Sequence, residues 1–319
     1  MPEVSVIMPA YNVEPYIGAS IDSILKQKHE DFELLVVDDG STDGTAQAVG
    51  DIAAKDARVK LIRQPNGGVS AARNTGLSHA IGAYIAFLDG DDFWSEEFLS
   101  RCVERIERLE MPAFCYARTK EVFLDGRTSV LGGEVPGCGT LKDFFYPKTG
   151  EIRLSFHISG LFIPKDIIER HAIRFPAGIK QGEDTAFFYQ LLGVAGAVPV
   201  DEVLTTYMRR EESATTKAYD PADWAGAVEM YGRIEDFLRE HAAEADFAAY
   251  KTMRGYHAYR FIRRTMKAGF LREADAYRKK FHDYIADFSQ GPYGKWGDRQ
   301  KAKLLLSDSP LAVKVASIL

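Results

Sequence analysis

Residues 84–92 read Tyr84-Ile85-Ala86-Phe87-Leu88-Asp89-Gly90-Asp91-Asp92, an apolar run followed at once by three carboxylates. A short unbroken apolar run is typical of a strand that is buried on both faces of a parallel sheet. In open α/β sheets, ligands bind beyond the carboxyl ends of the strands, which is where these acids emerge. Neighbouring carboxylates repel one another, and Mg²⁺ or Mn²⁺ prefers carboxylate oxygens. The stretch therefore predicts a cation site; an acidic turn that caps a helix beginning near Ser95 is the alternative.

Three earlier segments also have the apolar character of strands: residues 4–8, 32–37 and 59–62. Helical patterns separate them. The first of these carries Pro15 in its opening turn and places Ile17, Ile21, Ile24 and Leu25 on one face. This alternation of strand and helix from Val4 to Leu88 predicts a parallel sheet with helices on both faces.

Polar turns follow these strands. The first strand ends in Pro9-Ala10-Tyr11-Asn12, and the second ends in Asp38-Asp39-Gly40-Ser41-Thr42-Asp43. The third is followed by Asn66-Gly67-Gly68 and then by a helix. Backbone N–H groups at such a glycine-rich helix start can receive an anion. We expect these turns to lie at the same end of the sheet as the acids of residues 89–92.

Five motifs together resemble those of family 2 glycosyltransferases, and they stand in that family's order and spacing. They are residues 8–12, 36–45, 66–74, 87–92 and 175–185. The resemblance, to the type that builds bacterial surface polysaccharides, implies a Rossmann-like A-type glycosyltransferase fold, an α/β fold with a mainly parallel central sheet. It also implies binding of a nucleoside diphosphate sugar through Mn²⁺ or Mg²⁺ and transfer of the sugar with inversion.

The resemblance assigns donor-binding roles residue by residue. Pro9, Tyr11 and Asp39 match positions that hold the base, and the Asp39 carboxylate suits the imide N–H of uracil. A turn role for Asp38 and a solvated helical arginine at position 73 are the alternatives that stay open. The other donor-binding positions implied by the resemblance are Asn66, Gly67, Arg73 and Asp89.

The reaction requires neutralisation of the leaving diphosphate and a base for the acceptor hydroxyl. By resemblance Asp91 is the direct metal ligand, and Asp92 either assists it or caps the following helix. By the same resemblance Asp184 is the catalytic general base, and Glu183 orients it or contacts a substrate. The alternative for Glu183 and Asp184 is an acidic first turn stabilised by the helix dipole.

Three further residues are candidate contacts to the diphosphate or the acceptor: Arg209, Arg210 and His157. Pairing of the two arginines with Glu211 and Glu212, and a core or surface role for the histidine, are the alternatives. The Gln-x-x-Arg-Trp signature of processive polysaccharide synthases is missing. We therefore expect one or a limited number of additions to a glycan or lipid-linked acceptor.

Composition narrows the class of protein. The 319 residues carry a net charge of −6, which gives no reason to expect nucleic-acid binding. The three cysteines lack metal-ligand spacing and favour a reducing compartment. A first strand at Val4 leaves no room for a signal peptide, and no apolar run reaches the ~18 residues of a membrane span. We expect a cytoplasmic protein, with contact to the inner face of the cell membrane as an option.

Composition changes near Asp220, where strand alternation gives way to helical spacing. We expect a catalytic domain over residues 1–218 and a helical C-terminal region over residues 219–319. Residues 251–303 carry 14 Lys and Arg against 5 Asp and Glu, and aromatic residues are interleaved with them. Contact with an anionic membrane and packing on the catalytic domain or on a second copy in a homo-oligomer both stay open.

Between the two motif groups, the sequence predicts a helix over residues 95–110 and a hairpin that turns at Asp125-Gly126. Two other functions remain to be weighed against the glycosyltransferase: a sugar-nucleotide pyrophosphorylase and a catalytically silent nucleotide-sugar-binding module. A pyrophosphorylase carries a glycine-rich loop after its first strand, and this sequence does not have that loop. The intact Asp91 and Asp184 argue against a silent binding module. The sequence does not indicate which donor sugar is used or which linkage is formed.

Overall fold

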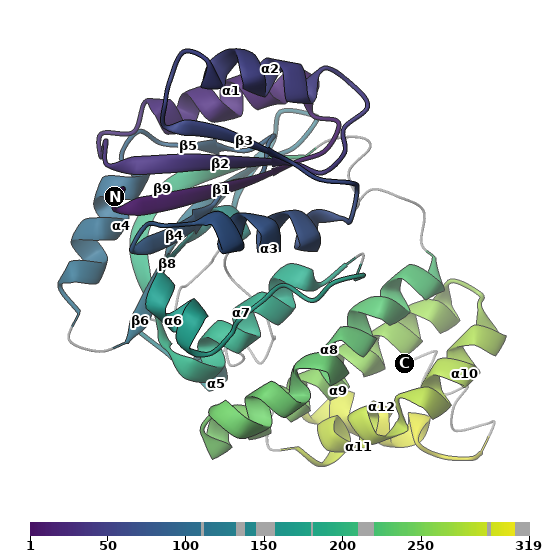
Figure 1. Ribbon diagram of the computed structural model, residues 1–319. Coiled ribbons are helices and arrows are strands. Elements are labelled where there is room, and N and C mark those ends of the chain that lie inside the picture. Colours follow the sequence, from purple (N-terminus) through teal and green to yellow (C-terminus); the bar gives the residue numbers. More distant parts are fainter. Residues whose placement is uncertain are drawn as a thin grey trace. The chain divides into compact units, whose positions relative to one another are not determined.

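The computed structural model describes residues 1–109, 112–131, 138–144, 157–179, 181–209, 220–291 and 295–309. The chain divides into two compact units. The sheet unit comprises residues 1–138, 155–178 and 194–217, and the helical unit comprises residues 139–154, 179–193 and 218–319. Both are drawn in Figure 1.

All strands in the described ranges belong to the sheet unit and form one sheet with the order β3-β2-β1-β4-β8-β6-β9-β5, with β7 beside β6. The first four are parallel, as the sequence predicted: β1 (Val4–Ala10), β2 (Phe32–Asp38), β3 (Val59–Arg63) and β4 (Tyr84–Phe87). The other half is mixed and contains β5 (Phe93–Trp94), β6 (Ala113–Val122), β7 (Thr128–Leu131), β8 (Leu161–Pro164) and β9 (Gly196–Met208).

The register of the parallel strands decides where their polar turns lie. In β1, Ala10 pairs with Asp38 of β2, and Ile7 pairs with Phe87 of β4. All residues of β1 and β2 are buried, and a slip of one residue would move every side chain to the opposite face of the sheet and disrupt the packing on both faces. The turns that follow β1, β2 and β4 are therefore fixed at one end of the sheet.

Helices cover both faces of the parallel strands, as expected (Figure 1). On one face lie α1 (Glu14–Leu25) and α2 (Thr45–Ala53), where Ile17, Ile21 and Ile24 enter the core. On the other lies α3 (Val69–His79). A Cβ at Gly76 of α3 would lie 2.3 Å from Ile7 Cγ2, so α3 can pack this closely on β1 only without a side chain there.

The predicted hairpin is present, because β6 and β7 pair and the turn passes through Gly126 at φ +80°. The helix expected over residues 95–110 is shorter and begins later, as α4 (Phe98–Glu107). Residues 95–97 instead connect α4 to the short strand β5, which pairs with β9. The remaining short helices of the sheet unit are η1 (Ile158–Gly160) and α6 (Lys165–Arg170).

The helical unit confirms the helical C-terminal region predicted from composition. The long helix α9 (Glu244–Lys267) packs against α8 (Pro221–His241), α10 (Leu271–Lys280) and α11 (His282–Gln290). Aromatic and aliphatic side chains of α9 and α11 form its core together with residues of α8, α10 and α12. The unit is completed by α5 (Leu141–Phe144), α7 (Glu183–Val194) and α12 (Trp296–Leu305).

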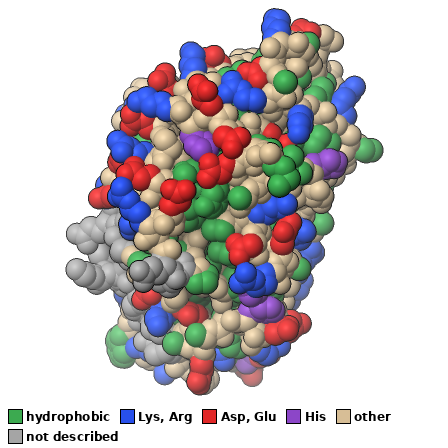
Figure 2. Space-filling view, turned by 60° about the vertical axis from the view of Figure 1, so that its left-hand side comes forward, with side chains coloured by type: hydrophobic (Ala, Val, Ile, Leu, Met, Phe, Trp, Pro, Cys, Tyr) green, Lys and Arg blue, Asp and Glu red, His purple; other side chains and the backbone are tan. Residues whose placement is uncertain are grey.

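The surface mixes charges of both signs. On the face shown in Figure 2, acidic and basic side chains are interspersed, with hydrophobic side chains between them. Among the described helices, none combines the length and the apolar character that crossing a bilayer requires.

Candidate active site

The turns after β1 and β2 are locked to each other by side-chain to backbone hydrogen bonds. Asn12, which has φ +51°, donates its N–H to Ser41 Oγ (3.0 Å) and accepts the N–H of Thr42 at Oδ1 (2.8 Å). The Val13 N–H donates to Thr45 Oγ1 at 2.9 Å. These bonds fix the segment that carries the predicted base-binding residue Tyr11, whose side chain is half exposed.

Asp39 organises the glycine-rich loop that precedes α3. Its Oδ1 accepts the side-chain amide of Gln64 (2.7 Å) and the N–H of Gly67 (2.9 Å), and its Oδ2 accepts the N–H of Gly68 (2.7 Å). The sequence predicted that these backbone N–H groups receive an anion, and the anion that they bind is this carboxylate. Gly68 has φ +85°, a conformation that glycine adopts without strain.

The neighbouring Asp38 has the turn role that was one of its two interpretations. Its Oδ1 accepts the N–H of Ser41 at 3.1 Å, and its Oδ2 accepts Arg63 Nε at 3.2 Å. The side chain is fully buried. Asp38 thus shapes the turn that presents Asp39.

Arg73 of α3 joins the glycine-rich loop region to the acidic turn. Its side chain is buried, its Nη2 lies 2.7 Å from Asp89 Oδ1, and its guanidinium lies 5.2 Å from the ring centre of Phe175. The interpretation of Arg73 as a solvated helical arginine is therefore wrong. Asn74 beside it exchanges two hydrogen bonds with the backbone of Phe175, which anchors that segment of the chain to α3.

Asp92 is the buried member of the acidic turn. Its Oδ2 accepts Ser159 Oγ at 2.9 Å, and its Oδ1 accepts the N–H of Met208 at 3.3 Å. Burial and then the carboxylates of Asp89 and Asp91 raise the pKa of Asp92 well above its usual range, although the two hydrogen bonds act in the opposite direction. The carboxylate ties the turn after β4 to η1 and to the end of β9.

The helix-cap interpretation of Asp92 is wrong, because α4 begins at Phe98 after Glu97 and no side chain caps it. Neither Ser159 nor the backbone of Met208 carries a signal in the sequence that would reveal this contact. Trp94 adds a second tie, since its Nε1 donates to the carbonyl of Ser159 at 2.7 Å.

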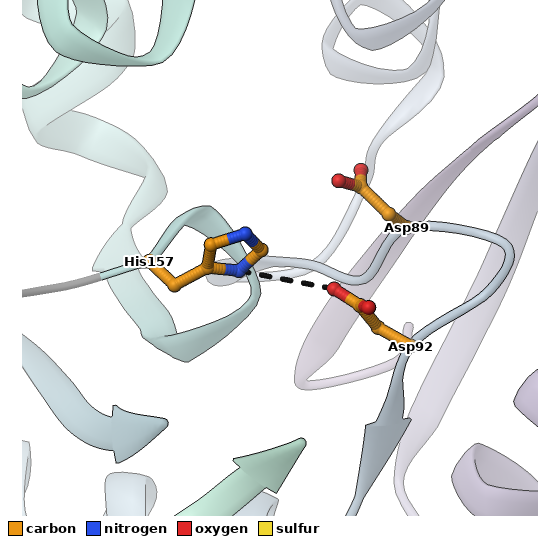
Figure 3. A group of neighbouring side chains, drawn as sticks. All are labelled: Asp89, Asp92 and His157. Carbon is orange, nitrogen blue, oxygen red and sulfur yellow. Dashed lines mark ion pairs between the residues drawn. The ribbon is translucent and has the colours of Figure 1, made fainter. Parts of the chain in front are cut away.

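Asp89, Asp92 and His157 form a group that could hold a cation (Figure 3), with one ligand atom of each lying within 4.8 Å of the others. His157 Nδ1 lies 3.8 Å from Asp92 Oδ2 and accepts the N–H of Ser159 at 3.3 Å. Two carboxylates and an imidazole suit Mn²⁺, and carboxylates suit Mg²⁺. A cation here would also offset the repulsion among the acids that raises the pKa of Asp92.

The end of β9 completes this part of the sheet unit. The ring of Tyr207 stacks on His157 with centroids 4.7 Å apart. Arg209 Nε lies 2.5 Å from Glu121 Oε1, so this arginine has an ion-pair partner on β6. Arg210 and those two glutamates lie outside the described residues.

Glu183 and Asp184 occupy the first turn of α7, where the sequence placed them. They belong to the helical unit, whereas Pro9, Asp39, Asn66, Arg73 and the acidic turn belong to the sheet unit. The predicted donor and cation residues named here thus share one unit, and Glu183 and Asp184 belong to the other. The roles of Asp91 and Asp184 stay predictions.

Residues 5–150 match the family model described as Glycosyl transferase family 2. They belong to glycosyltransferase family 2. The uncharacterized glycosyltransferase EpsJ of Bacillus subtilis (strain 168) is 34% identical over 230 residues, which are 70% of this chain and 65% of EpsJ. The chain thus spans slightly less than two thirds of the length of this relative.

Two of the solved structures to which the chain is similar are described by their bound donors. S. aureus TarS 1-349 in complex with UDP-GlcNAc has a TM-score of 0.74 at 22% identity, covering 100% of this chain and 91% of that one. The mannosyltransferase PcManGT from Pyrobaculum calidifontis, in complex with GDP-Man and Mn²⁺, has a TM-score of 0.52 at 18% identity, covering 99% and 86%. The likeness to TarS confirms the predicted A-type glycosyltransferase fold.

The contacts of Asp92 predict a difference between two substitutions. Asp92→Ala leaves the N–H of Met208 and the hydroxyl of Ser159 without their acceptor, and each buried group left unpaired costs about 1 to 3 kcal/mol. Asp92→Asn keeps one oxygen and removes a charge that burial disfavours. Urea denaturation should give a lower free energy of unfolding for the alanine variant than for the asparagine variant. Equal stability of the native chain and Asp92→Ala would contradict this role.

Proposed function

We propose that the chain transfers a sugar from a nucleoside diphosphate sugar, with uridine as the favoured base, to a hydroxyl of a glycan or lipid-linked acceptor. The transfer inverts the anomeric centre and is not processive. One observation carries the proposal: the parallel register sets the Asp39 loop, the Arg73–Asp89 pair and the acidic turn at one end of the sheet. This is the end at which ligands bind in open α/β sheets.

The base of the donor is assigned to Pro9, Tyr11 and Asp39. Within the described ranges Asp39 Oδ2 accepts one hydrogen bond, from the N–H of Gly68, so it retains a lone pair for the imide N–H of uracil. Because Asp39 also holds Gly67 and Gly68, base binding and loop conformation are coupled in this proposal. The UDP-GlcNAc complex of the structurally similar TarS supports uridine as the base.

The resident cation is assigned to Asp91 as direct ligand. Asp89 and His157 are candidate additional ligands, and Asp92 holds the turn in place. When bound, Mn²⁺ or Mg²⁺ supplies Lewis-acid neutralisation of the leaving diphosphate. Arg73 orients Asp89 through the 2.7 Å ion pair and limits the net negative charge of the turn. The Mn²⁺ complex of PcManGT supports the choice of metal.

Asp184 is the proposed general base. In-line attack from the face opposite the leaving group gives inversion, and Asp184 takes the proton of the attacking hydroxyl. Its segment follows Phe175, which Asn74 anchors to α3, by nine residues in the sequence. Glu183 has an orienting role, and Arg209 and Arg210 are proposed contacts to the diphosphate or acceptor.

The place of the reaction follows from its substrates. Nucleotide sugars and lipid-linked acceptors meet at the inner face of the cell membrane, so we place the protein in the cytoplasm or bound peripherally at that face. A homo-oligomer is compatible with this placement. No role for nucleic acid is proposed.

Release of products from a panel of nucleotide sugars with Mn²⁺ tests the reaction class. A transferase without its acceptor should release nucleoside diphosphate slowly, and the donor that is hydrolysed fastest identifies the sugar. Release of nucleoside monophosphate or pyrophosphate would instead show pyrophosphorylase chemistry. No release from any donor, with or without candidate acceptors, would favour a silent binding module.

The role of Asp184 predicts a split between chemistry and binding. Asp184→Asn keeps size and hydrogen bonding but cannot accept a proton, so kcat should fall by ~10² to 10⁴. Donor affinity, measured by calorimetry with Mn²⁺, should change little, because a general base acts in the transition state. Glu183→Gln, one residue earlier in the same helical turn, is the matched control and should lose less. Near-native transfer by Asp184→Asn would place the base elsewhere.

A further inference from the structure

The basic character of residues 251–303 is distributed unevenly in the helical unit. Arg254 is buried between Glu235 and Asp287, and its guanidinium lies 3.9 Å from the ring centre of Tyr284. Arg278, Lys279 and Lys280 are also ion-paired, with Asp275 or Glu229. These cations stabilise the helical unit and leave little charge for an external partner.

A second group of cations lies on the exposed stripe of α9 and at the corner that joins it to α10. Arg260, Arg264 and Lys267 follow one another at intervals of four and three residues, and all three are exposed. Arg272 is exposed at the start of α10. Arg260, Lys267 and Arg272 form no ion pair with any residue in the described ranges, and Glu273 is the one nearby acid in the first turn of α10.

The corner itself exposes two consecutive apolar side chains. Gly269 has φ +90°, and the N–H of Phe270 donates to the carbonyl of Thr265 at 3.1 Å, the pattern of a helix end closed by a left-handed residue. Such an end usually buries the residue after the glycine. Here Phe270 is 39% exposed and the next residue, Leu271, is 64% exposed.

The helix dipole explains cations in the last turn of α9, but it does not explain the apolar pair beside them. A water-exposed phenylalanine and leucine next to Lys267 and Arg272, which form no ion pair in the described ranges, match a surface that is anionic outside and apolar beneath. This is the character of an anionic lipid bilayer. A soluble polyanion would satisfy the cations and would leave Phe270 and Leu271 in water.

We propose that the α9–α10 corner, defined by Lys267, Phe270, Leu271 and Arg272, is the segment through which this protein contacts an anionic membrane. Phe270 and Leu271 enter the headgroup region, and the cations pair with lipid phosphates. The contact is reversible, because two apolar side chains and a few charges supply far less affinity than an inserted helix. The inference does not depend on the proposed reaction.

Co-sedimentation of the full chain with vesicles tests this contact. The native chain should bind phosphatidylglycerol vesicles, should bind phosphatidylcholine vesicles much more weakly, and should be released by salt. Leu271→Ser should weaken binding by roughly five- to tenfold, because its side chain no longer leaves water. The matched control is Leu124→Ser at the β6–β7 hairpin, where the leucine is 61% exposed, and this change should leave binding unaltered.

The charge contribution needs a separate pair of variants. Lys267→Gln with Arg272→Gln should weaken binding by about fivefold for each cation removed. Lys55→Gln with Lys120→Gln removes the same charge from exposed sites of the sheet unit and should leave binding close to native. All four variants change exposed side chains, and thermal unfolding should show that each is folded.

Three outcomes would overturn the proposal. The first is absence of binding to phosphatidylglycerol vesicles by the native chain, and the second is equal loss in corner and control variants. The third is that Leu271→Ser still binds lipid but changes its oligomeric state in light scattering. That result would make the corner a contact between copies of the chain. Because nucleotide-sugar hydrolysis is measured without lipid, its failure and the failure of membrane binding are distinguishable.

Discussion

The register of β1 between β2 and β4 is the constraint on which the rest of the site depends. Pairing of Ala10 with Asp38 and of Ile7 with Phe87 sets three polar turns at one end of the sheet. A shift of one residue would move every buried side chain of β1 to the opposite face of the sheet, so packing against the helices on both faces enforces the position of the acids. The core therefore determines the chemistry at this end of the sheet, although Pro9 alone among the buried residues of β1 is assigned a substrate contact in the proposed reaction.

Most of the acidic side chains at this end of the sheet have partners within the protein. Asp39 is satisfied by the loop before α3, Asp38 by a turn and Arg63, and Asp89 by Arg73. On the turn after β4, burial and then the neighbouring acids raise the pKa of Asp92. A cation at this turn would offset the repulsion among these acids.

Much of this was predictable from the sequence, because the signals are local. Apolar runs of strand length, helical spacing and the Asp125-Gly126 turn correctly predicted β1 to β4, the flanking helices and the hairpin. The contacts of Asp92 with Ser159 and of Arg209 with Glu121 were not predictable, because they join residues 67 and 88 positions apart through tertiary packing. The glycine-rich loop is a third case. The sequence predicted that its N–H groups receive an anion, but it did not predict that this anion is the Asp39 carboxylate of the protein itself. The boundary at residue 218 stays a prediction.

The central claim is that the turn after β4 binds a donor diphosphate through a divalent cation held by Asp91. Calorimetric titration of UDP into the chain, with Mn²⁺ and then with EDTA, tests it most directly. The account predicts binding at least about tenfold tighter with Mn²⁺, a difference of about 1.4 kcal/mol, and loss of that difference in Asp91→Ala. Equal affinity for UDP with Mn²⁺ and with EDTA, or an unchanged Mn²⁺ effect in Asp91→Ala, would contradict it.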